Sequence, residues 1–478
     1  MNIRLILYIT GWILNIEAVF MVPSVVVSLI YKEDCLPIVF AILICAVCGI
    51  ALVIKKPENR QFSIKEGYVA VAMAWLVMSA AGMLPFMFAG AIPNPFNAFF
   101  ETVSGFTTTG ASILHSVESV PKGLIFWRSM THWIGGMGIL VFLISVIPMV
   151  GGSKMNLMKA ESSGPSVSRI MPTAKESARM LYKIYIGMTV IMVVLLLADR
   201  MPLFDALTIT FGTAGTGGFG VLNDSCASYT TYQQVVVTVF MILFAVNFNV
   251  YFFALTRKFK DAFSVEEARW YLLIVAGATG LIAFDIRGDH SSIWQAIQQA
   301  AFQVASIIST TGYSTTDFNQ WPAVSCTVLV FLMILGGCSG STSGGLKVCR
   351  LVVQVKQLAR ELLFYLYPGS VRQIRLDGKK LDTSIIRSIN VFAGAYAMIF
   401  AVSLLLISFD GFDFTTNFTA VAATLSNIGP GLGKVGPASN FDLYSDFSKM
   451  VLSFDMLAGR LEIFPILLFF TPKTWKKF

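Results

Sequence analysis

Ten apolar runs, each about as long as a membrane is thick, constrain this chain more than any other feature of its sequence. A transmembrane helix needs about 20 consecutive apolar residues, whereas a barrel strand needs about ten residues of alternating polarity. Because lipid offers the backbone no hydrogen-bond partner, such runs indicate helices, which pair their own backbone groups. The sequence therefore predicts an all-α polytopic membrane protein. The runs cover residues 3–30, 36–54, 67–92, 122–150, 181–200, 229–256, 268–286, 322–360, 383–409 and 446–470.

The composition excludes the main soluble classes. Of the 478 residues, 55% are hydrophobic and 13% are charged, whereas soluble domains average about 25% charged residues. A soluble enzyme, a disordered regulator and a disulfide scaffold are therefore excluded. The net charge of +8 bears on membrane topology rather than on nucleic acid, and we expect no nucleic-acid partner. The first run continues without a small-residue cleavage site, so we expect it to be a retained helix.

The basic residues lie after the even-numbered runs. The largest group contains nine Lys and Arg residues. It extends from Lys347, near the end of the eighth run, to Arg387. Acidic residues such as Glu33 and Asp205 occupy the opposite connections. Lys and Arg favour the cytoplasmic side of a membrane. This alternation predicts ten spans with both termini in the cytoplasm.

Four connections on the acidic side share one pattern, an apolar half-helix followed by a stretch rich in Gly, Thr, Ser and Asn. Aligned on one glycine each, they read TTTGA, AGTGG, STTGY and SNIGP, with the glycines at Gly110, Gly217, Gly312 and Gly429. Repeats of this kind indicate architecture. We predict four pseudo-symmetric helix–re-entrant pore loop–helix repeats around one pore, after two extra transmembrane helices. The predicted units are residues 1–66, 67–180, 181–267, 268–382 and 383–478.

Four re-entrant loops indicate an ion pathway. Non-helical backbone at membrane depth persists only where it is buried in protein or lines water. Loops around one axis can replace a cation's hydration shell with carbonyl oxygens, and glycine permits the positive φ that this needs. The half-helices would point their negative C-terminal ends at the ion. The alternative is that the four segments are ordinary turns that contain glycine. The common alignment of the four segments disfavours this alternative.

The eighth run is interrupted by ten residues, Gly336 to Gly345, of which five are glycine and four carry hydroxyls. Each glycine costs a helix about 1 kcal/mol relative to alanine, so we expect a break that faces a cavity. A small-residue packing surface is an alternative. A second is a membrane serine protease, because Gly337-Cys338-Ser339-Gly340 matches G-x-S-G; that chemistry needs a general base, and the three histidines lie in other segments.

Six motifs together resemble the TrkH branch of the Trk/Ktr/HKT potassium transporters, over essentially the full length. The resemblance implies a potassium-selective pore in the bacterial cytoplasmic (inner) membrane, and no enzyme activity. It implies K⁺ as the transported ion, no bound organic cofactor, a homodimer with one pore per subunit, and a cytosolic TrkA-like nucleotide-binding regulatory subunit. The motifs are FTTTGAS at 106–112, HWIGGMGI at 132–139, GTAGTGGFG at 212–220, STTGYSTTDF at 309–318, GGCSGSTSGGLK at 336–347 and SNIGPGLG at 426–433.

Matching these motifs assigns expected roles to individual residues. The carbonyls that precede each aligned glycine would bind K⁺, together with Gly110, Gly217, Gly312 and Gly429. These carbonyls belong to Thr108, Thr109, Gly215, Thr216, Thr310, Thr311, Asn427 and Ile428. The expected gate loop contains Gly336, Gly337, Gly340, Gly344 and Gly345.

Arg460 lies inside the last run, where an arginine is expensive unless it faces protein or water. The resemblance implies an electrostatic barrier below the filter. A structural ion pair with Asp455 or Glu462 is the alternative. His132 is expected to be packed and hydrogen bonded rather than a metal ligand.

Three further features leave alternatives open. Cys45 and Cys48 form a C-x-x-C inside an apolar run, which favours packing over metal or redox chemistry. The basic segment from Lys347 to Arg387 could lie on anionic lipid or dock the regulatory subunit. The alternative function is an ion-coupled (H⁺ or Na⁺) secondary cation symporter, although parallel repeats around one axis favour a pore.

Overall fold

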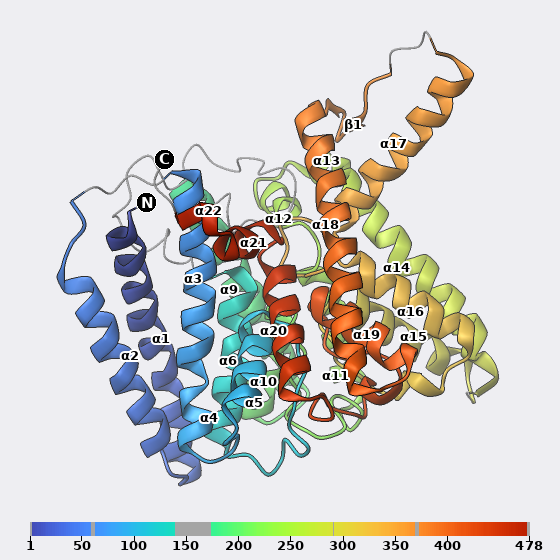
Figure 1. The fold of residues 1–478 in the computed structure, drawn as a ribbon. Coiled ribbons are helices and arrows are strands. Elements are labelled where there is room, and N and C mark those ends of the chain that lie inside the picture. Colours follow the sequence, from blue (N-terminus) through green and yellow to red (C-terminus); the bar gives the residue numbers. More distant parts are fainter. Residues whose placement is uncertain (1, 59–62, 139–173, 290, 369–371, 476–478) are drawn as a thin grey trace.

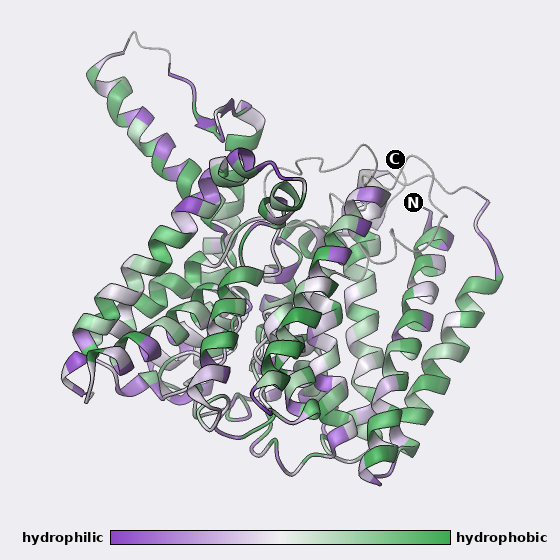
Figure 2. Ribbon diagram, turned by 180° about the vertical axis from the view of Figure 1, so that it is seen from behind, coloured by the Kyte–Doolittle hydropathy of each residue, from purple (hydrophilic) through white to green (hydrophobic). Residues whose placement is uncertain are grey.

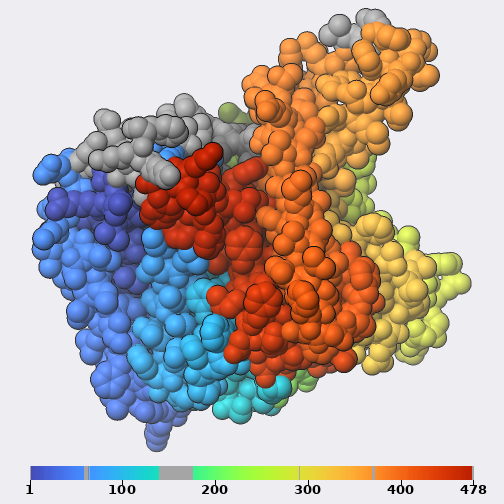
Figure 3. Space-filling view, viewed as in Figure 1, coloured from blue at the N-terminus to red at the C-terminus, as the bar shows by residue number. Residues whose placement is uncertain are grey.

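The computed structural model describes residues 2–58, 63–138, 174–289, 291–368 and 372–475. Long helices stand side by side around shorter ones, and a two-stranded hairpin lies at one end (Figure 1). The N-terminal helices form one side of the molecule, and an arm of orange residues projects from the other side (Figure 3). Figure 2 shows hydrophobic residues along most of the helices and hydrophilic residues gathered at their ends and on the arm.

The N-terminal unit is a helical hairpin, and the first repeat packs against it. An added Cβ at Gly11 would lie 2.8 Å from the carbonyl oxygen of Gly49, so glycines let the two hairpin helices approach closely. The helices are α1 (Ile3–Tyr31), α2 (Leu36–Ile54), α3 (Ile64–Gly82), α4 (Leu84–Phe88), α5 (Pro95–Phe106) and α6 (Lys122–Met137).

The other three repeats follow the same order of long helix, short helix and second helix. Repeat two contains α9 (Ala174–Ala198), α10 (Leu203–Gly215), α11 (Thr231–Phe244), α12 (Phe248–Leu255) and α13 (Phe259–Ser264). Repeat three contains α14 (Glu266–Asp285), η1 (Ile286–Asp289), α15 (Ile293–Ile308), η2 (Phe318–Gln320), α16 (Ala323–Leu335), α17 (Val348–Leu366) and the antiparallel strands β1 (Arg375–Leu376) and β2 (Lys379–Lys380). Repeat four contains α18 (Thr383–Ile407), η3 (Ser408–Asp410), α19 (Phe414–Leu425), η4 (Gly433–Val435), α20 (Asp446–Arg460), α21 (Phe464–Phe470) and α22 (Pro472–Trp475).

Not all of the ten predicted spans are single helices. In the described residues, six helices are long and apolar enough to cross a membrane, or seven if α11 and α12, bent by 93°, count as one span. The eighth run is divided into α16 and α17, and the last run into α20 and α21. The fourth run is described only as far as residue 138. Hydrophobicity marks these segments but is insensitive to breaks inside them.

The four short helices α5, α10, α15 and α19 are the predicted half-helices. They contain 12, 13, 16 and 12 residues, too few to span a membrane, and most of their residues are buried. The start of α1 and helix α22 lie at the same face of the molecule, from which α17 also projects (Figure 1). Of the basic residues expected at this face, six lie outside the described residues: Arg60, Lys154, Lys159, Arg169, Lys476 and Lys477.

Close helix contacts lead to a stability prediction. A Cβ added at Gly135 of α6 would lie 1.8 Å from the carbonyl oxygen of Phe106, whereas one at Gly187 of α9 would meet nothing within 4 Å. We expect Gly135→Ala to destabilise the protein by about 1–3 kcal/mol, and Gly187→Ala to be neutral or to stabilise it by up to about 1 kcal/mol. Thermal unfolding in detergent measures both, and equal effects of the two substitutions would contradict the packing described.

Candidate ion pathway

All four short helices end in the same cap. A residue with a left-handed backbone follows each helix within two positions of its end, with φ of 55° at Thr108, 56° at Thr216, 59° at Thr310 and 57° at Asn427. The next amide donates to the carbonyl five residues earlier, as in a Schellman motif. Left-handed geometry costs a side-chain-bearing residue about 1–2 kcal/mol, so the surroundings must hold it. The four amide bonds are Thr109 to Ser104 (2.9 Å), Gly217 to Gly212 (2.7 Å), Thr311 to Ser306 (2.9 Å) and Ile428 to Ala423 (2.8 Å).

A glycine with positive φ follows each left-handed residue by two positions. These glycines are Gly110, Gly218, Gly312 and Gly429, with φ of 80°, 79°, 88° and 100°. The predicted alignment is therefore wrong by one residue in repeat two, where Gly218 takes the place assigned to Gly217. The sequence GTAGTGGFG offers several glycines, and only the backbone conformation distinguishes between them.

The corrected alignment changes the assignment of two further residues. Thr216 and Gly217 now precede the aligned glycine, in place of Gly215 and Thr216. Gly215 is the last residue of α10, and its added Cβ would lie 2.2 Å from the carbonyl oxygen of His132. Gly215 therefore serves the packing of α10 against α6.

The four loops form a closed ring. A Cβ added at each aligned glycine would collide with the carbonyl oxygen that precedes the aligned glycine of the next loop. Because every contact joins consecutive loops and the fourth returns to the first, the loops surround one axis. The distances are 2.1 Å from Gly110 to Gly217 O, 1.9 Å from Gly218 to Thr311 O, 2.0 Å from Gly312 to Ile428 O and 2.7 Å from Gly429 to Thr109 O.

A cavity of about 150 Å³ lies on one side of this ring, and all four aligned glycines line it. The loops that follow them complete its wall, with His115 and Asn440 among the lining residues. The cavity and the ring place an open, polar space next to converging backbone carbonyls, as an ion entrance requires.

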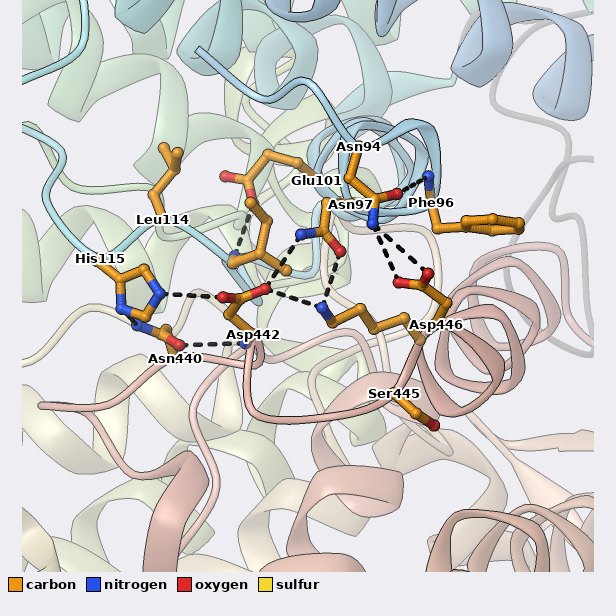
Figure 4. Close-up of polar contacts among 12 residues, drawn as sticks. Asn94, Phe96, Asn97, Glu101, Leu114, His115, Asn440, Asp442, Ser445 and Asp446 are labelled. Atoms are coloured by element: carbon orange, nitrogen blue, oxygen red, sulfur yellow. Dashed lines mark hydrogen bonds and ion pairs between the residues drawn. The ribbon is translucent and has the colours of Figure 1, made fainter. Parts of the chain in front are cut away.

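Beside this cavity, a polar cluster fastens repeat one to repeat four (Figure 4). The Asp442 carboxylate accepts hydrogen bonds from Asn97 of α5 (3.1 Å), Lys449 of α20 (2.8 Å) and His115 (3.0 Å). The other ring nitrogen of His115 accepts from Asn440 at 3.0 Å. Burial alone would raise the pKa of Asp442, but the bonds from Lys449 and His115 outweigh it and lower that pKa.

The depressed pKa of Asp442 predicts an acid-sensitive contact. A carboxyl whose pKa is lower in the folded state stabilises that state at neutral pH, and this contribution disappears as pH falls through the folded-state pKa. We expect the melting temperature of Asp442→Asn to fall less than that of the native chain between pH 7 and pH 4. Asp446→Asn, which removes an acceptor for Asn94, is the control. Parallel acid profiles for the native chain and Asp442→Asn would contradict this assignment.

On the other side of the ring, the segment between α16 and α17 touches loops three and four. The amide of Gly344 donates to the Thr310 hydroxyl at 2.7 Å, and a Cβ at Gly344 would lie 2.3 Å from the carbonyl oxygen of Ser426. The predicted gate glycines at 336, 337, 340, 344 and 345 all lie in this non-helical segment. The interruption is therefore placed directly against the ring.

Arg460, the last residue of α20, joins this segment to α6. Its guanidinium donates to the carbonyl oxygens of Thr342 (2.7 Å), Gly136 (2.7 Å) and Gly135. The two acids of the ion-pair alternative have other contacts. Glu462 forms an ion pair with Arg350, and Asp455 accepts from Ser403 at 2.6 Å.

Sequence reasoning missed Glu267, which bonds to the segment between α16 and α17 and to the first turn of α17. This buried α14 carboxylate accepts from the amides of Ser339 (2.5 Å) and Cys349 (3.1 Å) through Oε1. The available signal was an acidic residue directly before the seventh apolar run. The hydroxyl of Ser339 has no hydrogen-bond partner among the described residues, and the protease alternative gains no Ser–His pair from the two histidines described.

His132 is packed and hydrogen bonded, as expected. Its Nδ1–H donates to the carbonyl of Gly105 at 2.7 Å, and its Nε2 accepts from the amide of Phe219 at 3.3 Å. Cys45 is buried and Cys48 is exposed, and both are free thiols. Over the described part of the chain, no group of three or more His, Cys, Asp and Glu side chains is placed to hold a metal.

The family model TrkH, described as a cation transport protein, matches residues 37–477. The chain belongs to the TrkH family. Trk system potassium uptake protein TrkH of Vibrio parahaemolyticus is 34% identical over 490 residues and covers all of both chains. TrkH of Escherichia coli K12 is 36% identical over 432 residues, with 88% of each chain covered.

The fold comparison agrees with the sequence comparison. The crystal structure of the potassium transporter TrkH from Vibrio parahaemolyticus superimposes with a TM-score of 0.89 at 32% identity, over all of both chains. The expected family and the all-α repeat fold are therefore confirmed. As a TrkH-family member, the chain is a multi-pass membrane transporter and not an enzyme.

Proposed function

We propose that this chain takes up K⁺ across the bacterial inner membrane through a pore formed by its four re-entrant loops, with both termini cytoplasmic. The closed ring of glycine–carbonyl contacts is the observation that supports this most directly. The relatives named as potassium uptake proteins support the choice of ion.

The ion would be held by backbone carbonyls. The candidate residues carry no formal charge at these oxygens, which suits a monovalent cation that must bind and then leave. The negative ends of α5, α10, α15 and α19 add a favourable potential. With the corrected alignment, the carbonyls belong to Thr108, Thr109, Thr216, Gly217, Thr310, Thr311, Asn427 and Ile428.

The segment from Gly336 to Gly345 would act as the gate, because it lies against loops three and four and carries small side chains. Arg460 places a positive charge at this segment, and that charge opposes a cation on the path. Opening would require the Arg460 contact to Thr342 to break or move.

The partner assignments extend this proposal. Helix α17 projects from the helical body (Figure 1), and Val355, Leu358, Leu362 and Tyr365 are all exposed. Their spacing places them on one face of the helix, and we assign this face to a second copy of the chain in a homodimer. The basic residues of the same arm would contact anionic lipid and a TrkA-like regulatory subunit.

Transport measurements test the ion site. In cells that lack their own potassium uptake, we expect the native chain to take up Rb⁺ with little competition from Na⁺. Gly110→Ser and Gly218→Ser should each lower this preference about tenfold, equivalent to about 1.4 kcal/mol, because a side chain there meets the carbonyl of the next loop.

Gly187→Ala is the control for these variants, because nothing lies near its added Cβ. Unchanged ion preference in both serine variants, with the protein present in the membrane, would contradict the placement of the filter. Uptake that requires a proton or sodium gradient would identify symport instead of passive conduction.

Arg460→Ala tests the gate. Removing the guanidinium removes both the positive charge and the bonds to the gate segment, so we expect basal Rb⁺ flux to rise severalfold. Arg460→Lys, which keeps the charge without the fork of donors, should raise the flux less. Unchanged or reduced flux in Arg460→Ala at normal expression would assign this residue a structural role.

A further inference from the structure

A buried ion pair lies behind the first two loops of the ring. Arg128 Nε of α6 and Glu101 Oε1 of α5 are 2.7 Å apart, with side-chain exposures of 3% and 0%. Burying two charges carries a desolvation cost that the attraction between them repays only when their remaining hydrogen-bonding groups are also used. Their further contacts therefore show what the pair supports.

Glu101 holds the exit of loop one. Its Oε1 also accepts from the hydroxyl of Ser112 at 3.0 Å, and its Oε2 accepts from the amide of Ile113 at 2.9 Å. These residues follow the aligned Gly110 by two and three positions. The carboxylate thus fixes the backbone directly after the ring contact.

Arg128 holds the exit of loop two in the same way. Its Nη1 donates to the carbonyl of Gly220 at 3.3 Å, and its guanidinium carbon lies 3.4 Å from the centre of the Phe219 ring. These residues follow the aligned Gly218 by one and two positions. Because Gly110 of loop one packs against the carbonyl of Gly217 in loop two, the ion pair joins two loops that are already neighbours.

The pair has no counterpart at the same position of the other repeats. Glu101 lies nine residues before Gly110, and the corresponding residues are Ile209, Gln303 and Ala420. All three are neutral and buried. Loop one alone therefore has an acidic side chain at this position behind it.

We propose that the Glu101–Arg128 pair is a specificity-determining support, which keeps loops one and two at the separation that suits K⁺ and not the smaller Na⁺. This proposal rests on the proposed function. A filter discriminates through the number and arrangement of its carbonyls. Loops that can relax inwards would let the same carbonyls coordinate Na⁺.

The test must distinguish an effect of loop spacing from an effect of the charge on Arg128. Arg128 lines the outer cavity, so leaving it without Glu101 repels every monovalent cation equally. The ratio of K⁺ to Na⁺ preference is therefore the informative quantity, because a purely electrostatic or folding defect leaves it unchanged. Glu101→Gln keeps the size of the side chain and removes its charge.

We expect Glu101→Gln to lower the preference for Rb⁺ over Na⁺ in uptake about tenfold, and Arg128→Lys to lower it by a smaller factor because it loses the fork of donors. Ile209→Val, a buried change at the same position of repeat two, should leave the ratio unaltered. An unaltered ratio in Glu101→Gln, with uptake retained, would overturn the proposal.

Thermal unfolding of the purified full-length chain provides a readout that does not need transport. A bound ion raises the melting temperature according to its affinity, so KCl should stabilise the native chain more than NaCl does. In Glu101→Gln this difference should shrink, and an undiminished difference would overturn the proposal. A native chain that prefers neither ion would instead reject the proposed function, which keeps the two failures distinct.

Discussion

The backbone at membrane depth must find partners within the protein, and the rest of the structure depends on this constraint. Lipid supplies no donor or acceptor, yet the four pore loops are non-helical backbone inside the protein core. Before each loop, the chain ends a short helix with a left-handed residue and an amide bond to the carbonyl five residues earlier. These shared caps place four glycines where neighbouring loops touch, and so they turn four separate interruptions into one ring.

The gate segment meets the same constraint with charged side chains instead of caps. Glu267 accepts hydrogen bonds from two backbone amides. Arg460 donates to three backbone carbonyls, one in the segment between α16 and α17 and two in α6. Charges in or beside apolar runs are costly, but these two bond to backbone groups of the non-helical segment and of the adjoining ends of α6 and α17. Glu267 and Arg460 therefore mark one place where the backbone is irregular.

The sequence predicted the helical membrane fold, the repeats and the position of the helix break between α16 and α17, because hydrophobic length and glycine content are local properties. It placed the aligned glycine of repeat two one residue early, since adjacent glycines are equivalent until φ is known. It also missed Glu101, Arg128 and Glu267. Their hydrogen-bond partners lie 11 to 92 residues away in the chain, and no local sequence pattern indicates such contacts.

The four loops are alike in backbone but differ in what supports them. Loops one and two are held from α6, by Arg128 and by His132, whose ring bonds the carbonyl of Gly105 and the amide of Phe219. Loops three and four instead contact the gate segment through Thr310 and Ser426. A displacement of the segment between α16 and α17 would therefore reach loops three and four directly, whereas loops one and two are bonded to side chains of α6. A single chain with four unequal loops can keep two loops rigid and let the other two move. In four identical subunits, all four loops would have the same supports and the same freedom to move.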